Sequence, residues 1–259
     1  MKIYIHTSGR PHKQTTLRGF SKKLLEDTVL VVQAKQFTDH EHRYGKRCEV
    51  VALPDHITKL SPTRQWILEN AETNEFVMLD DDLTFSYRLP GTGVKLHKAN
   101  EQVIESMFAD MEELLKGGYA HVGISAREGN NHVDAGVKTV GRMMRIPGYN
   151  KATVFEEQCR LDRVETKQDF DMTLQLLRKG WPNAIIYSYA HNQPGSNNAG
   201  GCSIYRTPEV MARCSHELAA LHPDFVTVVE KETKSSWGGG TRTDVRIAWK
   251  KAYESYQRP

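Results

Sequence analysis

Three consecutive aspartates, Asp80, Asp81 and Asp82, directly follow the apolar run Phe76–Leu79. Carboxylates side by side at the end of a buried strand repel one another, and a divalent cation removes that cost. Alternate residues of an extended chain point the same way, so we expect Asp80 and Asp82 to share one ion. Hard carboxylate oxygens suit Mg²⁺ or Mn²⁺, which also bind substrate phosphates. An acidic turn or a helix cap is the alternative, but no helical pattern follows directly.

A second acidic site lies at the start of the predicted helix Asp169–Lys179. This segment begins with Asp169 and Asp171 and ends in basic residues, a distribution that suits the helix dipole. If the start of the helix faces a cavity, a carboxylate there can accept the proton of an acceptor hydroxyl, which makes Asp169 a candidate general base. Spacing alone leaves ordinary helix-end charges as an equal alternative.

One histidine, His191, follows the predicted strand Ile185–Tyr189 and opens a loop rich in Asn and Gly. Imidazole is a common ligand of transition metals such as Mn²⁺, so His191 is a candidate third ligand. An isolated histidine is more often an ordinary surface residue, and only its context decides between the two.

The loop after the first predicted strand, Lys2–His6, is a candidate nucleotide site because open α/β sheets bind ligands at the carboxyl ends of their strands. Neither the GxxxxGK(S/T) pattern of a P-loop nor a GxGxxG turn occurs there, which disfavours ATP hydrolysis and dinucleotide binding. The expected contacts to the nucleotide of a donor are Thr7, Ser8, Gly9, Arg10, Asp80 and Asp81.

Short apolar, β-branched runs alternate with helical patterns, as in an α/β protein with parallel strands. The predicted strands are Lys2–His6, Thr28–Val32, Glu49–Leu53, Phe76–Leu79, Tyr119–Ala126, Ile185–Tyr189 and Phe225–Val229. An amphipathic helix is predicted over residues 101–116, and a last helix is predicted to dock through Val245, Trp249 and further apolar residues. We expect one domain over residues 1–259, with a nucleotide-binding half, 1–82, and an acceptor-binding and catalytic half, 83–259.

The composition, 39% hydrophobic and 26% charged among 259 residues, is that of a globular rather than a disordered chain. No apolar run is long enough to span a bilayer, and the N-terminus lacks the apolar segment of a secretory signal, so we expect a cytoplasmic protein without a membrane partner. The four cysteines are Cys48, Cys159, Cys202 and Cys214. None forms a CxxC pair, which favours free thiols over a zinc site.

The net charge of +3 is unevenly distributed. Residues 1–47 carry ten Lys and Arg against four Asp and Glu, and residues 231–259 carry seven against three, giving local charges of +6 and +4. Two basic ends favour an anionic partner, such as a nucleotide diphosphate or a nucleic acid, with an ordinary solvated surface as the alternative.

In this order, the elements resemble the GT-A glycosyltransferases. A strand and loop open the nucleotide site, a later strand ends in a DxD motif at Asp80–Asp82, an acidic and leucine-rich helix spans Gln168–Gly180, and His191 follows the next strand. The resemblance implies an α/β fold of the GT-A type, with a Rossmann-like nucleotide-binding half and a mixed central sheet flanked by helices.

The same resemblance assigns roles to residues. It implies a divalent metal, Mn²⁺ or Mg²⁺, held by Asp80, Asp82 and His191, and a nucleotide-sugar donor, for which a UDP-sugar is expected. It also implies that Asp169 is the catalytic base of an inverting enzyme. Gln168 stands where members of the family usually carry Glu.

Within that superfamily the C-terminal half resembles the TET-associated glycosyltransferases of phages. The segments that carry this resemblance are Asp169–Gly180, Gly200–Thr207, Leu221–Val226, Trp237 and Asp244–Tyr253. The resemblance implies transfer of a sugar onto a hydroxymethylated pyrimidine, such as 5-hydroxymethylcytosine, in DNA, and location in the host cytoplasm if the chain is phage-encoded. The alternatives are a GT-A enzyme acting on a cell-surface glycan or lipid, and a non-catalytic nucleic-acid-binding module that contains a metal.

Overall fold

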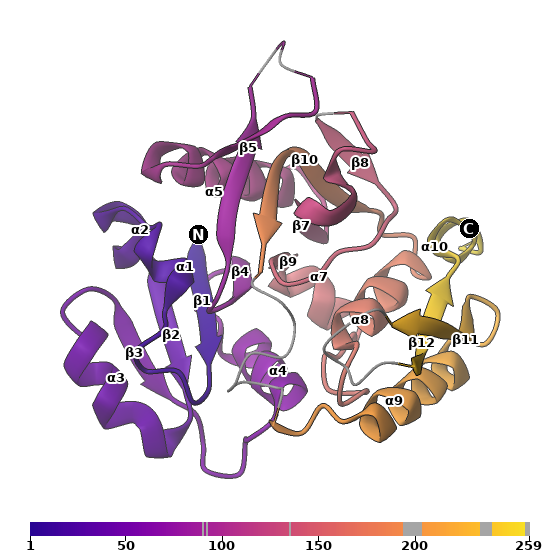
Figure 1. Cartoon of the computed structure of the whole chain (residues 1–259), viewed down its shortest axis with the longest axis horizontal. Coiled ribbons are helices and arrows are strands. Elements are labelled where there is room, and N and C mark those ends of the chain that lie inside the picture. The colour runs from indigo at the N-terminus through magenta and orange to yellow at the C-terminus, as the bar shows by residue number, and fades with distance from the viewer. Residues whose placement is uncertain (90, 92, 135, 194–203, 234–239, 257–259) are drawn as a thin grey trace.

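The computed structural model describes residues 1–89, 91, 93–134, 136–193, 204–233 and 240–256. Its centre is a ten-stranded mixed sheet, in which nine strands follow the order β3-β2-β1-β4-β9-β7-β10-β5-β6 and β8 pairs with β10 (Figure 1). The strands are β1 (Lys2–Thr7), β2 (Thr28–Val32), β3 (Glu49–Ala52), β4 (Glu75–Asp80), β5 (Thr84–Arg88), β6 (Leu96–Lys98), β7 (His121–Ala126), β8 (Val137–Thr139), β9 (Pro147–Asn150) and β10 (Asn183–Asn192).

The first four strands pair with one another in parallel, as the apolar runs predict. β1 pairs in parallel with β2 on one side and with β4 on the other, and β2 pairs in parallel with β3. The strand order therefore reverses at β1, and ligands of open α/β sheets bind at such a reversal. The register places His6 of β1 beside Asp80 of β4, so the carboxyl ends of both strands meet at one edge.

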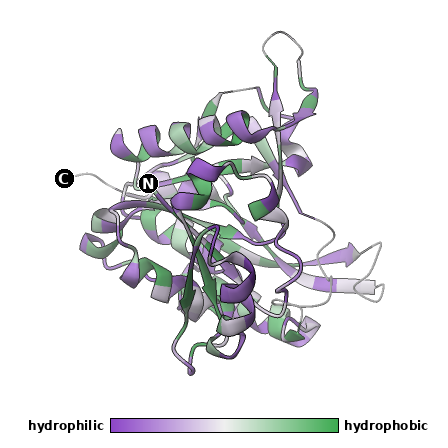
Figure 2. Cartoon of the chain, turned by 90° about the vertical axis from the view of Figure 1, so that its left-hand side faces the viewer, coloured by the Kyte–Doolittle hydropathy of each residue, from purple (hydrophilic) through white to green (hydrophobic). Residues whose placement is uncertain are grey.

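Helices cover both faces of the sheet and leave two separate cores. The helices are α1 (Thr15–Arg18), α2 (Lys22–Glu26), η1 (Ala34–Gln36), α3 (Phe37–Tyr44), α4 (Leu60–Asn70), α5 (Glu101–Lys116), α6 (Arg127–Asn130), α7 (Lys151–Glu156), α8 (Gln168–Leu177), α9 (Pro208–Leu221) and α10 (Trp249–Glu254). Ile3 and Ile5 of β1 pack with α1, α2 and α5, whereas Tyr4 packs with α4, α7 and α8 on the opposite face, as strand alternation requires. Figure 2 shows hydrophobic residues along the central strands and on the helix faces that cover them.

The predicted helix 101–116 is observed as α5 with the same bounds. Asn100 caps it, because its Oδ1 accepts a hydrogen bond from the backbone N–H of Val103 at 3.0 Å. Apolar side chains recur every three to four residues and bury one stripe of the helix against the sheet. None of the helices in the described part of the chain is long and apolar enough to cross a membrane.

A third core joins α8, α9, α10 and an antiparallel pair of strands, β11 (Val226–Thr233) and β12 (Gly240–Ile247). The prediction of a last helix that includes Val245 is wrong, because Val245 lies in β12 opposite Val228 and the helix begins only at Trp249. The alternation of Thr241, Thr243, Val245 and Ile247 is a strand pattern, since β-branched side chains recur with a period of two.

The cysteines that the structure describes, Cys48, Cys159 and Cys214, are buried free thiols, as predicted. Cys202 and Trp237 lie outside the described residues. Burial raises the pKa of the Cys48 and Cys159 thiols to about 11, and both thiols therefore stay protonated at neutral pH.

Candidate active site

The carboxyl end of β4 carries the first acidic group. Asp80 is the last residue of the strand, and its Oδ1 lies 2.9 Å from Nη2 of Arg64 and 3.2 Å from Nε2 of His6. Burial opposes ionisation of Asp80, but the hydrogen bond from His6 and the charge of Arg64 hold the pKa of this carboxyl well below its usual range. Asp80 is therefore a fixed anion at neutral pH.

Asp81 and Asp82 follow in a turn and share a different cation. Nη1 of Arg10 lies 3.0 Å from Oδ1 of Asp81 and 2.9 Å from Oδ2 of Asp82. The extended backbone ends at Asp80, so strand alternation does not reach Asp82, and Asp82 shares its cation with Asp81 rather than with Asp80. That Asp80 and Asp82 share a metal ion stays a prediction. Gln193 also donates from Nε2 to Oδ1 of Asp82 at 2.8 Å.

The turn that carries these aspartates is held by Thr16, at the start of α1. The backbone N–H of Thr16 donates to the carbonyl oxygen of Asp81 at 3.1 Å, and its Oγ1 donates to the carbonyl oxygen of Asp80 at 2.7 Å. The same Oγ1 accepts from the backbone N–H of Leu83 at 2.9 Å. Thr16 is fully buried and positions the acidic turn, a role that no sequence pattern indicated.

The predicted nucleotide loop lies at the end of β1, beside this turn. Thr7 donates from Oγ1 to Oδ2 of Asp81, and Arg10 binds the acidic turn as described above. Gly9 has φ of +71°, a left-handed conformation that favours glycine, and its N–H donates to Oε1 of Gln36 at 3.0 Å. Ser8 is half-buried. The structure thus brings the loop and the aspartates together, and their contacts to a nucleotide remain a prediction.

His191 lies in β10, next to Ala126 of β7 and Phe85 of β5, and is fully buried. Neither ring nitrogen has a hydrogen-bond partner among the described residues. Burial, followed by the charge of Arg145, lowers the pKa of His191 to about 3, so the ring is neutral. A neutral buried imidazole with two unused nitrogens fits the predicted role of a metal ligand.

A bound cation would need ligand oxygens in addition to those of the protein side chains. Within the described ranges, no three His, Cys, Asp or Glu side chains gather closely enough to hold a metal ion by themselves. Mg²⁺ and similar ions often take only one or two carboxylates and complete their coordination with substrate phosphates. The acidic turn already holds the guanidinium of Arg10 between two carboxylates, which shows that it accommodates positive charge. The residues therefore fit a metal that is bound together with a diphosphate.

The second acidic group is at the start of α8. Asp169 is half-buried, and its Oδ1 accepts a hydrogen bond from the backbone N–H of Phe170 at 3.1 Å. Within the described part of the chain its carboxylate forms no ion pair. Asp171 is fully buried, with Nε2 of His222 at 2.8 Å and Nε2 of Gln175 at 2.9 Å. The two neighbouring acids of this helix therefore have opposite surroundings.

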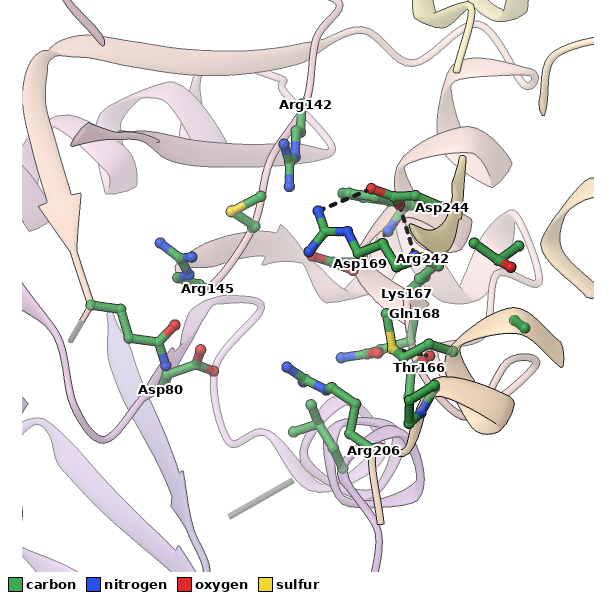
Figure 3. A pocket seen from close by; sticks show the side chains of 18 of the residues that line it. Asp80, Arg142, Arg145, Thr166, Lys167, Gln168, Asp169, Arg206, Arg242 and Asp244 are labelled. Atoms are coloured by element: carbon green, nitrogen blue, oxygen red, sulfur yellow. Dashed lines mark hydrogen bonds and ion pairs between the residues drawn. The ribbon is translucent and has the colours of Figure 1, made fainter. Parts of the chain in front are cut away.

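A cavity of about 570 Å³ joins the two acidic groups (Figure 3). Asp80 and Asp169 both line it, together with Gln193. The basic residues of its lining are Arg64, Arg142, Arg145, Lys167, Arg206 and Arg242. The acidic residues are Asp80, Asp169, Glu209 and Asp244. Six positive side chains against four negative ones leave a surplus of positive charge, which suits an anionic ligand.

Two of these basic residues have strained backbones. Arg145 and Lys167 both have φ of +63°, in the left-handed region that costs a residue with a side chain about 1–2 kcal/mol. The carbonyl oxygen of Arg145 accepts from the N–H of Asp80 at 3.2 Å, and that of Lys167 accepts from the N–H of Phe170 at 3.0 Å. Strained residues cluster at functional sites, and here one lies beside each acidic group.

The basic lining has no signature in the sequence, because its members come from separate segments and follow no spacing rule.

Among known proteins, the model of the TET-Associated Glycosyltransferase family matches residues 1–201 of the 259. The chain belongs to the TET-associated glycosyltransferase family. The match includes Asp80–Asp82, Asp169 and His191 and ends before most of the C-terminal segments on which the resemblance was based.

Curated relatives and solved structures agree with this membership. The Beta-glucosyl-HMC-alpha-glucosyl-transferases of Enterobacteria phages T6 and T2 are each 21% identical over 208 residues, covering 75% of this chain and 72% of theirs. Residues 1–349 of Staphylococcus aureus TarS, solved with UDP-GlcNAc, match with a TM-score of 0.57 and 15% identity, covering 85% of this chain and 67% of that one. GalNAc-T7, solved with UDP, GalNAc and Mn²⁺, matches with a TM-score of 0.56 and 7% identity, covering 83% and 47%.

These likenesses confirm the predicted GT-A fold, with a mixed central sheet flanked by helices. The TET-associated family member described here is a glycosyltransferase. The non-catalytic nucleic-acid-binding module is therefore set aside as an alternative.

Proposed function

We propose that this glycosyltransferase moves a sugar from a nucleotide-sugar donor, expected to be a UDP-sugar, onto a hydroxymethylated pyrimidine in DNA. The observation that carries the proposal is the single cavity that joins Asp80, at the end of β4, to Asp169, at the start of α8, within a basic lining. Support for the acceptor comes from the phage relatives, whose names specify HMC. Support for the donor comes from the structural neighbours that contain UDP-GlcNAc or UDP with Mn²⁺.

The donor would occupy the Asp80 side of the cavity. Thr7–Arg10 and Asp81 would contact the nucleotide, and Asp80, Asp82 and His191 would hold Mn²⁺ or Mg²⁺. When bound, such an ion neutralises the charge that develops on the leaving diphosphate. Arg64 fixes the Asp80 carboxylate at 2.9 Å, so this ligand is oriented before the donor arrives.

The acceptor would occupy the Asp169 side. Asp169 accepts the proton of the acceptor hydroxyl while the hydroxyl oxygen forms a bond to the anomeric carbon of the sugar. The bond from that carbon to the diphosphate breaks on the opposite side, so the configuration of the sugar inverts. Asp169 suits the task because its carboxylate forms no ion pair with a described residue and faces the cavity.

A second acceptor is favoured by the names of the phage relatives. Those enzymes act on β-glucosyl-HMC, so a hydroxyl of a sugar already attached to the base is the alternative nucleophile. Their names also specify an α linkage, which makes the configuration of the new glycosidic bond informative. Either acceptor would be encountered in the cytoplasm of an infected host if the chain is phage-encoded.

The test is the release of nucleoside diphosphate from a UDP-sugar in the presence of Mn²⁺. Release should rise when the enzyme receives DNA with 5-hydroxymethylcytosine or its glucosylated form, and not with unmodified DNA of the same sequence. A glycan or lipid acceptor is the remaining rival. Stimulation by such an acceptor, with none by either modified DNA, would contradict the proposal.

A further inference from the structure

Two arginines that line the cavity on the Asp169 side differ from its other cations. Arg64 pairs with Asp80, and Lys167 pairs with Asp244. Arg142 and Arg206 form no ion pair or hydrogen bond with any residue that the structure describes, and Nε of Arg206 is buried without a partner. Both guanidinium groups point into the cavity in Figure 3. Arg206 is half-buried, and an unpaired charge at such a position is unfavourable unless a ligand neutralises it. Arg142 is more exposed, and the nearby charges of Asp169 and Asp244 attract its guanidinium without forming an ion pair with it.

Arg142 is held against the first turn of α8. Its Cζ lies 5.1 Å from the centroid of the Phe170 ring, in a cation–π contact. Phe170 in turn packs edge-to-face on Trp249, with 5.7 Å between ring centroids. Phe170 directly follows Asp169, so these contacts place the guanidinium of Arg142 over the helix turn that carries the proposed base.

Arg206 enters the cavity from a different segment, just before α9. Its neighbours on both sides are anchored: the hydroxyl of Tyr205 accepts from the backbone N–H of Leu60 at 3.0 Å, and Oγ1 of Thr207 caps α9 by accepting from the N–H of Val210 at 3.3 Å. The backbone position of Arg206 is therefore fixed, while its guanidinium remains available for a ligand.

The wall between these two arginines is itself basic. Asp244 is one carboxylate that faces three cations, with Nζ of Lys231 at 2.9 Å, Nζ of Lys167 at 3.1 Å and Nη2 of Arg242 at 3.3 Å. One negative charge among three positive ones leaves this wall with a net charge of +2. A ligand that reaches Asp169 therefore meets positive charge from Arg142, Arg206 and the Asp244 cluster.

We propose that the Asp169 side of the cavity is a phosphodiester subsite, in which Arg142 and Arg206 bind a phosphate of the acceptor strand next to the modified nucleotide. The planar guanidinium matches two phosphate oxygens at once, so a bound phosphate fixes both the position and the orientation of the strand. The acceptor hydroxyl is thereby placed over Asp169. This inference rests on the proposed function and assigns the donor diphosphate to the other side of the cavity, near Asp80 and Arg145.

The experiment pairs protein variants with altered DNA. Oligonucleotides carry 5-hydroxymethylcytosine and a single neutral methylphosphonate linkage, placed on either side of the modified nucleotide. The variants are Arg142→Gln and Arg206→Gln, and Arg160→Gln is the matched control because Arg160 is exposed, does not line the cavity and lies outside the two basic ends of the sequence. Thermal unfolding shows whether each variant is folded, and Arg142→Gln replaces the more exposed side chain if Arg206→Gln fails to fold.

We expect one methylphosphonate position to lower kcat/KM of the wild-type enzyme by about 10–100-fold, as the loss of a charge-assisted hydrogen bond does. Each variant should show a similar loss with natural DNA and little further loss with the methylphosphonate. The affinity for UDP should be unchanged in both variants, and Arg160→Gln should behave as the wild type.

Two results would overturn the inference. If the methylphosphonate lowers kcat/KM equally in the wild type and the variants, the arginines do not contact that phosphate. If either variant loses affinity for UDP, its arginine belongs to the donor site. Failure of the wild type to modify the 5-hydroxymethylcytosine oligonucleotide without a methylphosphonate is a different result, because it would contradict the proposed function itself.

Discussion

At the carboxyl end of β4 every aspartate faces a cation, whereas at the start of α8 Asp169 forms no ion pair with a described residue. Asp80 pairs with Arg64, and Asp81 and Asp82 share Arg10. Carboxylates that are paired with a cation remain anionic and keep their positions, which suits groups that bind a positive ion. A carboxylate that faces a cavity and forms no ion pair can accept a proton during turnover, which suits a general base. The difference in ion pairing thus distinguishes a holding site, the aspartates Asp80–Asp82, from a reacting site, Asp169.

The same contrast appears within α8 itself. Asp169 and Asp171 are two residues apart, and the sequence shows both only as acids of the first helical turn. The structure exposes one to the cavity and buries the other beside His222 and Gln175. Asp171 therefore joins α8 to the end of α9 rather than contacting a substrate.

The largest expected effect is at the holding site. Asp82→Ala should abolish transfer and the metal-dependent part of donor binding while the fold is retained, because the acidic turn is anchored by the backbone contacts of Thr16. Calorimetric titration of UDP with and without Mn²⁺ measures this. Asp162→Ala, at an exposed pair with Arg160, is the control. Unchanged Mn²⁺-dependent affinity in Asp82→Ala would exclude Asp82 as a metal ligand.

Next is the reacting site. Asp169→Asn keeps the shape of the side chain and removes its basicity, so kcat should fall by about 10²–10⁴-fold. The affinity for UDP should be nearly unchanged because the donor would bind on the Asp80 side. Steady-state kinetics with saturating donor measures the change. Turnover of Asp169→Asn near the wild-type rate would mean that the base is elsewhere or that the reaction retains configuration.

A smaller effect concerns the two basic ends of the sequence, residues 1–47 and 231–259. The local charges of +6 and +4 should bind DNA phosphates and release counterions, so affinity should fall by about 10–100-fold between 50 and 200 mM salt if two or three phosphates are contacted. Fluorescence anisotropy with labelled DNA across a salt series measures the slope. Absence of binding even at low salt would favour a glycan acceptor.

The smallest effect on catalysis is expected from Asp171→Asn. His222, Gln175 and Arg163 now contact the two carboxylate oxygens of Asp171, and an amide keeps only one acceptor oxygen and no charge. The free energy of unfolding should therefore fall by about 1–3 kcal/mol. Denaturant unfolding measures this, and kcat per folded molecule should change by less than about tenfold. A loss of kcat as large as that of Asp169→Asn would erase the distinction between the two acids.

Sequence patterns predicted the strands and helices that are determined by residues close together in the sequence. Phe76–Leu79 is a buried strand because its apolar run is continuous, and this places Asp80 at a sheet edge. Val245 was assigned to a helix because it is spaced four residues from Trp249, although pairing with β11 makes its segment a strand. Arg142 and Arg206 could not be found, since they meet only after distant segments fold together and no spacing relates them.

The proposed transfer is tested most directly by the mass of a defined DNA duplex with 5-hydroxymethylcytosine after incubation with the enzyme, Mn²⁺ and a panel of nucleotide sugars. We expect the modified strand to gain the mass of one sugar residue from at least one UDP-sugar, and Asp169→Asn to leave the strand almost unmodified in the same time. An unchanged mass with every donor, for both the hydroxymethylated duplex and its glucosylated form, would contradict it.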